Sequence, residues 1–445
     1  MVDENKTPNH IAKTIALPAL LVISLLTARL VMHSKTGLRL SAPIELNRSG
    51  LSISMPSGNG WQCEEKWSFE NSSFNVSSIF ANGLNDRSYA QCRYLLAADN
   101  KTPKERLGQE YSGTKLFVTG QSITGNLAVN WASANTDVGV EIVLGVCDLA
   151  DGRQLEIEIL QSASEQTPAK DIFEKIVKSI RFSDNKLLQA GARLISDIRD
   201  QGLDITPGDS SKTPTSLFTI ADSHNRTIGF TMDAMVLVKK DANATINAAD
   251  YYYLRGTAAN EQVSFFHGSA DLRQFAWQVK TSSKMGNKGV EMSADSGILS
   301  VRRLRASSPF DKRTGKDTGE YELGETAVPD IVLEPILIKA LDSNEQAFII
   351  DIIRSDGDII PAYIEKSPRS KDQTDSNSLR LELLDGRNYS QQTYYDGSKK
   401  PAKIVLTQES TYTLNRTDAN EIATIFPERA SLVNDKNQLL DREGL

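Results

Sequence analysis

A long apolar run near the N-terminus limits what this chain can fold into. The nineteen residues Thr14–Met32 contain a single charge, that of Arg29. A helix of this length spans roughly 28 Å, which is just enough to cross the apolar part of a bilayer. Arg29 lies near the end of the run, where its long side chain can reach the lipid headgroups. We therefore expect a transmembrane anchor over residues 14–33, preceded by a cytoplasmic tail over residues 1–13.

A cleaved signal peptide and a buried helix are the two alternatives to an anchor. A signal peptide needs small residues at the third and first positions before the cut. Cleavage after Ala28 places Leu26 at the third position, and cleavage after Ala42 places Leu40 there, so neither site fits well. A buried helix of a soluble protein is apolar on one face only, whereas this run is apolar all round. An uncleaved anchor accounts for the run better than either alternative.

The side of the membrane is indicated by weaker signals. Basic residues lie on both sides of the run, so the positive-inside rule does not fix its orientation. The composition of the downstream chain is typical of an envelope protein. We therefore expect a cell-membrane protein with a single span and with the bulk of the chain outside the cytoplasm.

The charge balance of the remaining chain excludes one class of partner. Residues 44–445 carry 45 Lys or Arg and 55 Asp or Glu. An acidic surface repels phosphate backbones, so we expect no nucleic-acid partner. These roughly 400 residues are enough for two or three domains.

The cysteines and histidines do not indicate a metal site. Cys63, Cys92 and Cys147 lack the CxxC spacing of zinc sites, and the chain has only 4 histidines. It also has no P-loop and no GxGxxG motif, so we expect neither a metal nor a cofactor. In an oxidising compartment Cys63 and Cys92 can form a disulfide, which leaves Cys147 as a thiol in an apolar strand. Three unpaired thiols are the alternative.

The first domain is expected over residues 47–184. Gly50–Met55 alternates apolar and polar residues as a half-buried strand does, and further strand patterns follow it. Thr102 and Pro103 favour the start of a short helix. A second helix, which begins after Thr167-Pro168, closes the domain. Its apolar residues form one stripe that can cover a face of a sheet: Ile172, Phe173, Ile176, Val177 and Ile180.

Two stretches of this domain carry a resemblance to a known family. They are the strand end with Met-Pro-Ser-Gly and Gly-Trp at residues 55–61, and the terminal helix IFEKIVKSIRF at residues 172–182. Together with the meander between them, they resemble the PsbP-like and DcrB-like family over roughly 135 residues. The resemblance implies a small α/β/α domain. It implies no site residues, because members bind different partners and share no catalytic set. The polar stretch Asn71–Arg87 departs from the pattern and is expected to be a decorated loop.

The second domain is expected over residues 217–427, after a connecting helix and linker over residues 185–216. Its pattern is a succession of strands with tight Asp-Gly turns, which is typical of antiparallel hairpins. One helix over residues 328–341 interrupts the strands, and we expect Pro335 to kink it. Residues 428–445 are expected to be a polar tail.

A long antiparallel meander around one apolar helix resembles the LolA/LppX-like half-barrel in architecture, without any signature residue of that family. The resemblance implies a concave sheet that faces a helix. In such folds the space between them can hold acyl chains or can be packed solid. The fold class expected for the whole chain is therefore α+β: a transmembrane helix, an α/β/α domain, and a large antiparallel sheet or half-barrel around a helix.

Two clusters are candidate binding sites. The first is an apolar set that can line a cavity for a lipid or another apolar ligand, with an ordinary core as the alternative. The second is a basic group, Arg302, Arg303 and Arg305, that can contact anionic headgroups or an acidic partner, with protection of an edge strand as the alternative. The apolar set consists of Phe230, Phe265, Phe266, Phe275, Trp277, Leu333 and Leu337.

The sequence contains no recognisable catalytic set. His224 lies in a turn, and His267 ends a strand with Asp271 nearby in sequence. Neither has a GxSxG motif or a reactive cysteine to complete a site, so we expect no enzyme. The leading hypothesis is a non-catalytic envelope protein that binds or scaffolds a partner protein. A carrier of lipid or of another apolar ligand is the first alternative, and a hydrolase with an unrecognised site is the second.

Overall fold

The computed structural model describes most of the chain, with gaps. The described residues are 38–46, 48–58, 60–63, 68–70, 73–82, 86–96, 101–111, 117–149, 153–162, 168–182, 185–203, 205, 215–240, 243–255, 260–284, 286–305, 316–367, 377–385 and 388–434. The anchor expected over 14–33 and the tail over 1–13 lie outside them. Among the described residues, no helix combines the length and the apolarity that a membrane crossing requires.

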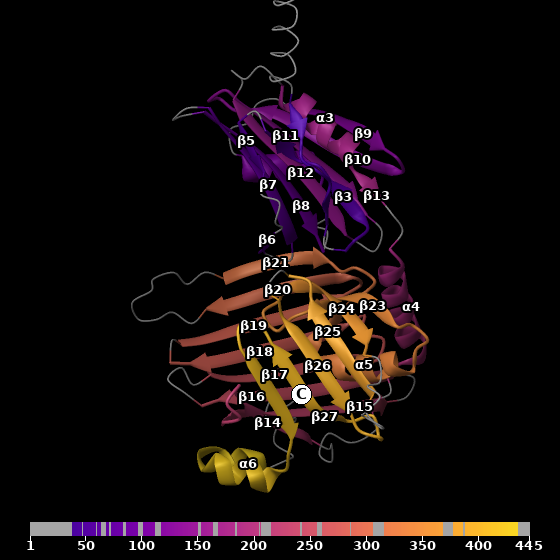
Figure 1. Cartoon of the computed structure of the whole chain (residues 1–445), viewed down its shortest axis with the longest axis vertical. Helices are drawn as coiled ribbons and strands as arrows, with labels where there is room; N and C mark the ends of the chain where they lie inside the picture. The colour runs from indigo at the N-terminus through magenta and orange to yellow at the C-terminus, as the bar shows by residue number, and fades with distance from the viewer. Residues whose placement is uncertain are drawn as a thin grey trace, which may run out of the picture.

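The expected α+β class is wrong, because the described part of the chain is mainly β. Two large sheets dominate it, and the helices are few and short (Figure 1). The helices expected to form whole layers of the first domain, α2 (Pro103–Glu110) and α3 (Ala169–Ser179), have only 8 and 11 residues. The longest described helix, α4 (Lys186–Gln201), has 16 residues and carries charges along its length.

The first large sheet has 8 strands in the order β5-β7-β8-β12-β11-β10-β9, with β6 paired to β7. The stretch expected to be a decorated loop instead contains the whole of β7, a strand of 10 residues. Small strands beside the sheet are β1 (Arg39–Leu40), β2 (Ile44–Glu45), β3 (Leu51–Ile53), β4 (Pro56–Ser57) and β13 (Arg181–Phe182). The sheet strands are β5 (Trp61–Cys63), β6 (Ser68–Glu70), β7 (Ser73–Asn82), β8 (Asp86–Leu95), β9 (Val118–Thr124), β10 (Leu127–Asn135), β11 (Val140–Asp148) and β12 (Gln154–Ser162).

A helix covers each face of this sheet. On one face α3 buries the expected stripe, and Phe173 meets Trp131 edge to face at 6.5 Å between ring centroids. On the other face Leu107 of α2 packs with Ala132, Ile142 and Leu144. A capping box between Thr102 and Glu105 fixes the start of α2.

The second large sheet has 15 strands in the order β21-β20-β19-β18-β17-β16-β15-β14-β28-β27-β26-β25-β24-β23-β22. All neighbours are antiparallel except β22 and β23, which are parallel. The strands up to β21 are β14 (Thr215–Ala221), β15 (Thr227–Lys240), β16 (Asn243–Leu254), β17 (Asn260–Ser269), β18 (Phe275–Ser283), β19 (Gly286–Asp295), β20 (Ile298–Arg305) and β21 (Lys316–Glu322). The others are β22 (Ala327–Pro329), β23 (Ala347–Ile353), β24 (Ile359–Lys366), β25 (Asn377–Leu383), β26 (Ser390–Tyr395), β27 (Pro401–Thr407) and β28 (Thr411–Arg416).

This second sheet curves into a barrel-like shape. Its two edge strands, β21 and β22, follow one another in the chain and are separated only by residues 323–326. Arg303 on β20 donates to Asp358 Oδ1 at 3.0 Å and to the carbonyl of Asp356 at 2.9 Å, both at the β23–β24 turn. Strands near opposite edges of the sheet therefore touch. Figure 1 shows the two halves of the sheet crossing one another.

Helices lie on both sides of this curved sheet. The helix expected over 328–341 begins later, because residues 327–329 form β22 and residues 330–332 a 3-10 turn, η3, before α5 (Leu333–Asp342). Ile336, Leu337 and Ala340 of α5 are buried in the interior core. Outside, α6 (Ala419–Ile425), η4 (Pro427–Arg429) and α7 (Ala430–Asn434) cover β14–β17. The tail expected from residue 428 is thus helical as far as residue 434.

Candidate functional site

The structure divides the expected apolar set between two faces of one sheet. Phe230 and Phe265 lie on the outer face with Phe426 and the C-terminal helices. Phe266, Phe275 and Trp277 lie on the inner face, in the core that also contains Leu337 and touches Leu333. Neighbours in a strand point to opposite faces, so Phe265 and Phe266 cannot line the same space. The inner members are buried within a continuous apolar core.

Two members of the basic group, Arg302 and Arg303, have acidic partners. Arg302 pairs with Glu291 at 3.0 Å, and Arg303 makes the contacts that close the sheet. The strand that carries them, β20, is covered by β21 and so is not an edge strand. Arg305 is the last residue of β20. The contacts of Arg303 with Asp356 and Asp358 give it a role in closing the sheet.

The structure does not bring together Cys63 and Cys92, the pair that an oxidising compartment would allow to form a disulfide. Cys63 on β5 lies opposite Ser78 on β7, while Cys92 on β8 lies opposite Val76. Two strand spacings separate the thiols, or about 10 Å, and a disulfide needs Cα atoms within about 7 Å. Burial raises the pKa of the Cys147 thiol to about 11, and burial with the Glu156 charge raises that of Cys92 further.

The two described histidines differ in their surroundings. His267 Nδ1 shares a 2.6 Å hydrogen bond with Asn247 Oδ1, while the nearby Asp271 instead accepts from Ser269 and from the backbone of Arg273. His224 is exposed in the β14–β15 turn, 3.4 Å from the Ser223 hydroxyl. The structure therefore does not bring Asp271 to the imidazole that the sequence placed beside it.

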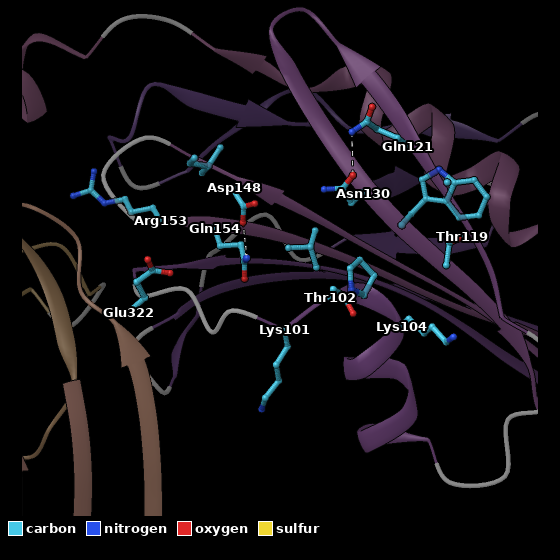
Figure 2. Close-up of a pocket in the computed structure, with 15 residues that line it drawn as sticks. Lys101, Thr102, Lys104, Thr119, Gln121, Asn130, Asp148, Arg153, Gln154 and Glu322 are labelled. Carbon is cyan, nitrogen blue, oxygen red and sulfur yellow. Dashed lines mark hydrogen bonds between the residues drawn. The ribbon is translucent and has the colours of Figure 1, made fainter. Parts of the chain in front are cut away.

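A cavity of about 900 Å³ opens where the two large sheets meet. Figure 2 shows its polar lining: Gln121, Asn130, Asp148 and Gln154 on the strands of the first sheet, Lys101 and Lys104 at the start of α2, and Glu322 on β21 of the second sheet. Pro103, Trp131, Val146 and Leu149 supply its apolar lining. Both signs of charge and several amides therefore face one space.

Hydrogen bonds fix the amides of this junction cavity. Gln121 Nε2 donates to Asn130 Oδ1 at 3.0 Å, and Gln154 Nε2 donates to Asp148 Oδ1 at 2.8 Å (Figure 2). The buried Arg106 donates to Gln154 Oε1. These contacts leave further lone pairs and N–H groups on the amides for a ligand.

A buried ionic network supports this wall of the cavity. Arg106 and Arg93 both bind Glu156, and the Tyr111 hydroxyl donates to Glu158. Burial raises the pKa of Glu158, against the opposing effects of Tyr111 and Arg93. In the sequence, Glu156 and Glu158 have the alternation of a solvent-facing strand side. Only the position of α2 over that side shows that both are buried.

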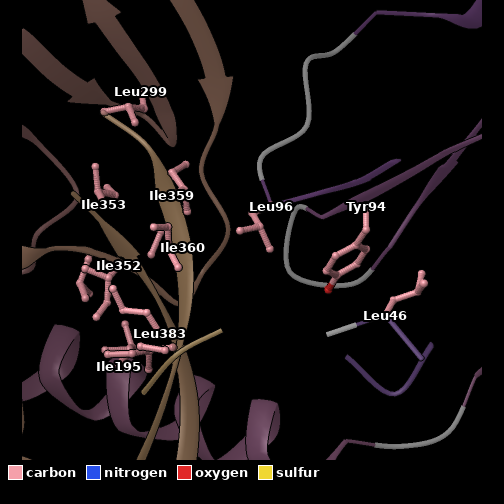
Figure 3. Packing of buried hydrophobic residues seen from close by; sticks show 14 of the residues in the cluster. Leu46, Tyr94, Leu96, Ile195, Leu299, Ile352, Ile353, Ile359, Ile360 and Leu383 are labelled. Carbon is pink, nitrogen blue, oxygen red and sulfur yellow. The ribbon is translucent and has the colours of Figure 1, made fainter. Parts of the chain in front are cut away.

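The opposite wall is fixed by contacts between the two sheets. Arg153, just before β12, donates to Asp351 on β23 at 2.7 Å, and both side chains are almost completely buried. Thr326 donates to the same carboxylate oxygen at 3.0 Å. Figure 3 shows Leu96, which directly follows β8 of the first sheet, beside Ile359 and Ile360 of the second sheet, within one buried apolar cluster. The cavity therefore has walls that are held in one relative position.

A second cavity, of about 1070 Å³, lies at the strand ends near the end of α4. Leu203, Leu237 and Phe275 supply its apolar lining, and Arg199 and His267 are among its polar residues. Burial lowers the pKa of Arg199, and the nearby Arg273 lowers it further. Of the expected apolar set, Phe275 lines this cavity.

Comparisons with known proteins do not assign the chain to a family. No protein-family model matches the chain, and no curated protein matches it. Thirteen chains of solved structures match. One is a beta-barrel-like protein of the domain of unknown function DUF1849 from Brucella abortus, with 11% identity over 46% of this chain and 95% of that chain, at a TM-score of 0.34.

Proposed function

We propose that this protein is a non-catalytic binding protein that holds an extended segment of a partner protein in the junction cavity. The observation that carries the proposal is a cavity of about 900 Å³ lined by amides and by charges of both signs, between two sheets. A peptide backbone alternates N–H donors and C=O acceptors, and side-chain amides can pair with both. The apolar lining residues Pro103, Trp131, Val146 and Leu149 can receive apolar side chains of the same segment.

The charges that line the junction cavity, and the rigidity of its walls, also favour an extended peptide segment as the ligand. Lys101 and Lys104 lie at the α2 side of the cavity, whereas Asp148 and Glu322 line other parts of it. A bound segment with charges of both signs would place its acidic residues near the lysines and its basic residues near Asp148 and Glu322. Only one orientation of the segment allows this, so the charges give specificity. The buried Arg153–Asp351 pair fixes the walls before the partner arrives, and a preorganised site loses less entropy on binding.

A peptide library displayed on phage tests this proposal with the full chain as bait. Peptides that are selected are then titrated against Asn130→Ala and Lys104→Ala, with Asn287→Ala as the matched control, because Asn287 is an exposed amide on β19 of the second sheet. We expect the cavity variants to weaken binding about tenfold, or ~1.4 kcal/mol, and the control to leave it unchanged. Equal binding by all variants would show that the peptides lie elsewhere.

A carrier of an amphipathic ligand is the second candidate. The cavity at the strand ends favours it, because Leu237 and Phe275 line that cavity together with Arg199. An acyl chain with an anionic end matches that arrangement. Native mass spectrometry of the purified full chain tests it. A lipid that is bound to the native chain and absent from Leu237→Asp would support the carrier hypothesis. Protein free of lipid after gentle purification would contradict that hypothesis.

The place of action is part of the proposal. We place the described part of the chain outside the cytoplasm, on the basis of its composition alone. Labelling of intact cells with an amine reagent that cannot cross membranes tests this, since exposed lysines such as Lys288 are available to it. Labelling only after lysis would place the chain inside.

A further inference from the structure

Four carboxyl groups face the interior of the curved sheet. Asp233 on β15 and Asp250 on β16 are direct partners across the two strands. They share the inner face with Leu237 and Ile246, which belong to the interior core. The 3-10 turn η3 packs against β16 and brings Asp330 to this region, and Glu334 follows at the start of α5. Carboxylates directly opposite one another on a sheet repel.

These carboxyl groups have few partners. Asp233 accepts from Thr231 at 3.1 Å, and Asp250 accepts from Ser264. No lysine, arginine or histidine in the described ranges lies within 4.0 Å of any of the four. Arg354 near Asp330 and Arg416 near Glu334 act only at longer range.

Burial without a cationic partner raises the pKa of all four carboxyl groups. Burial, followed by the charges of Asp250 and Glu334, raises the pKa of Asp233 to about 8. Burial and the Asp250 charge raise the pKa of Asp330 to about 7, against the effect of Arg354. Burial also raises the pKa of Asp250 and of Glu334. Asp233 and Asp330 therefore hold protons more readily than exposed carboxyl groups do, and a cation can replace those protons.

A second, independent feature of the same interior is an unsatisfied hydroxyl. Tyr395 on β26 is 1% exposed, and its phenol has no hydrogen-bond partner of acceptable geometry among the described residues. Thr393, two residues earlier on the strand, is close enough to lower the Tyr395 pKa but not to satisfy the hydroxyl. Burial and the Glu334 charge raise that pKa, so the phenol lies within electrostatic range of Glu334. A buried hydroxyl without a partner can form a hydrogen bond with a bound ligand.

The ligand that fits is larger than a metal ion. Nowhere in the described part of the chain do three His, Cys, Asp or Glu residues converge closely enough to hold one. Tyr252 on the inner face of β16 and Tyr389 near Asp330 add aromatic surface. Carboxylates spaced apart, with tyrosine rings among them, are suited to an organic ammonium with several N–H groups. The inner residues Ile404 and Leu414 of the neighbouring strands are only partly covered.

We propose that the interior of the curved sheet binds a polyamine-like organic cation between Asp233, Asp250, Asp330 and Glu334. The ammonium groups pair with the carboxylates, the phenol of Tyr395 accepts one N–H, and the tyrosine rings face the methylene and ammonium surface. Protons leave the carboxyl groups as the cation enters, so binding releases protons to the buffer and strengthens as the pH rises. This site is separate from the junction cavity.

Calorimetric titration of the full chain with spermidine in buffer of about physiological ionic strength tests the proposal. We expect one site per chain, a higher affinity at pH 9 than at pH 6, and a heat that depends on the ionisation enthalpy of the buffer. Asp233→Asn and Glu334→Gln are each expected to weaken binding at least tenfold, and Tyr395→Phe several-fold. Glu409→Gln is the matched control, because Glu409 is exposed in the β27–β28 turn, and it is expected to change affinity less than twofold.

Two outcomes overturn the proposal. Equal affinity of the interior variants and the control shows that spermidine binds the acidic surface only. Tighter binding of Mg²⁺ than of spermidine, with the same dependence on Asp233, shows a metal site instead. Asp233→Asn removes an interior charge, so its melting temperature above pH 8 is expected to rise, and that measurement shows that loss of binding does not come from loss of the fold.

Discussion

Arg153 Nη2 lies 2.7 Å from Asp351 Oδ2, and this pair joins two sheets from residues almost two hundred positions apart. Its side chains are 3% and 0% exposed. A charge buried to that degree is tolerated because its partner is in place, and removal of one partner leaves the other without compensation. The junction cavity and the relative position of the two sheets both depend on this contact.

Replacement of Arg153 by Met is expected to lower the free energy of unfolding by about 3–5 kcal/mol. The Asp351 carboxylate would then keep only its hydrogen bond to Thr326. Urea denaturation measures the loss. The control is Arg193→Ala, which breaks the exposed pair with Glu345 between α4 and the start of β23, and is expected to cost less than about 1 kcal/mol. A similar loss in both variants would contradict the special role of the buried pair.

Gly191 is expected to resist substitution by Ala even though it lies within a helix. A Cβ atom there would lie 1.9 Å from the carbonyl oxygen of Ile349, so α4 would have to move away from β23. Gly108 in α2 has no atom within 4 Å of the same position. Thermal unfolding should show Gly191→Ala losing about 2 kcal/mol or more and Gly108→Ala gaining up to about 1 kcal/mol. Stabilisation by both substitutions would show that α4 is not held this closely.

Stability is expected to fall as the pH rises toward 8. The pKa of Asp233 is about 8 in the folded chain and near the ordinary value of 3.8 when unfolded. A carboxyl group with a raised folded pKa stabilises the fold fully below its unfolded pKa, and this stability is lost as the pH approaches the folded pKa. Urea midpoints from pH 5 to pH 9 measure this. In Asp233→Asn the decline should be smaller by on the order of 1–3 kcal/mol, and an unchanged decline would exclude Asp233 as its source.

The Cys92 and Cys147 thiols are expected to react slowly in the folded protein. Both are buried, and burial raises the pKa of each above its ordinary value of 9.0, so little thiolate forms at neutral pH. Timed alkylation followed by peptide mass spectrometry compares the native chain with the chain in urea. We expect both sites to be labelled at least a hundredfold faster in urea. Rapid native labelling of Cys92 would show that β8 opens.

Local patterns in the sequence are enough to predict several elements. The apolar stripe that follows Pro168 corresponds to α3, and the Asn185 cap and the Gly202 stop enclose α4. Asp356-Gly357 and Asp396-Gly397 lie at observed turns. Each of these signals lies within a few residues of the structure it predicts, so no distant contact is needed to interpret it.

Other features depend on contacts that the sequence does not display. The pairing of Phe218 with Arg416 in the middle of the second sheet joins distant strands. The acids Glu156 and Asp233 occupy strand positions that look solvated until a helix or the opposite half of the sheet covers them. One error was avoidable: Phe265 and Phe266 are consecutive in a strand, and the period of two already separates them.

The central pairing of β14 with β28 has a consequence for synthesis of the chain. The first strand of the curved sheet cannot pair with β28 until about two hundred further residues have been synthesised, because that distance in sequence separates Phe218 from Arg416. The strands between them can form two ribbons that meet through residues 323–326. A nascent chain truncated before residue 411 would therefore present two unjoined ribbons with open edges, a form that chaperones recognise and that aggregates readily.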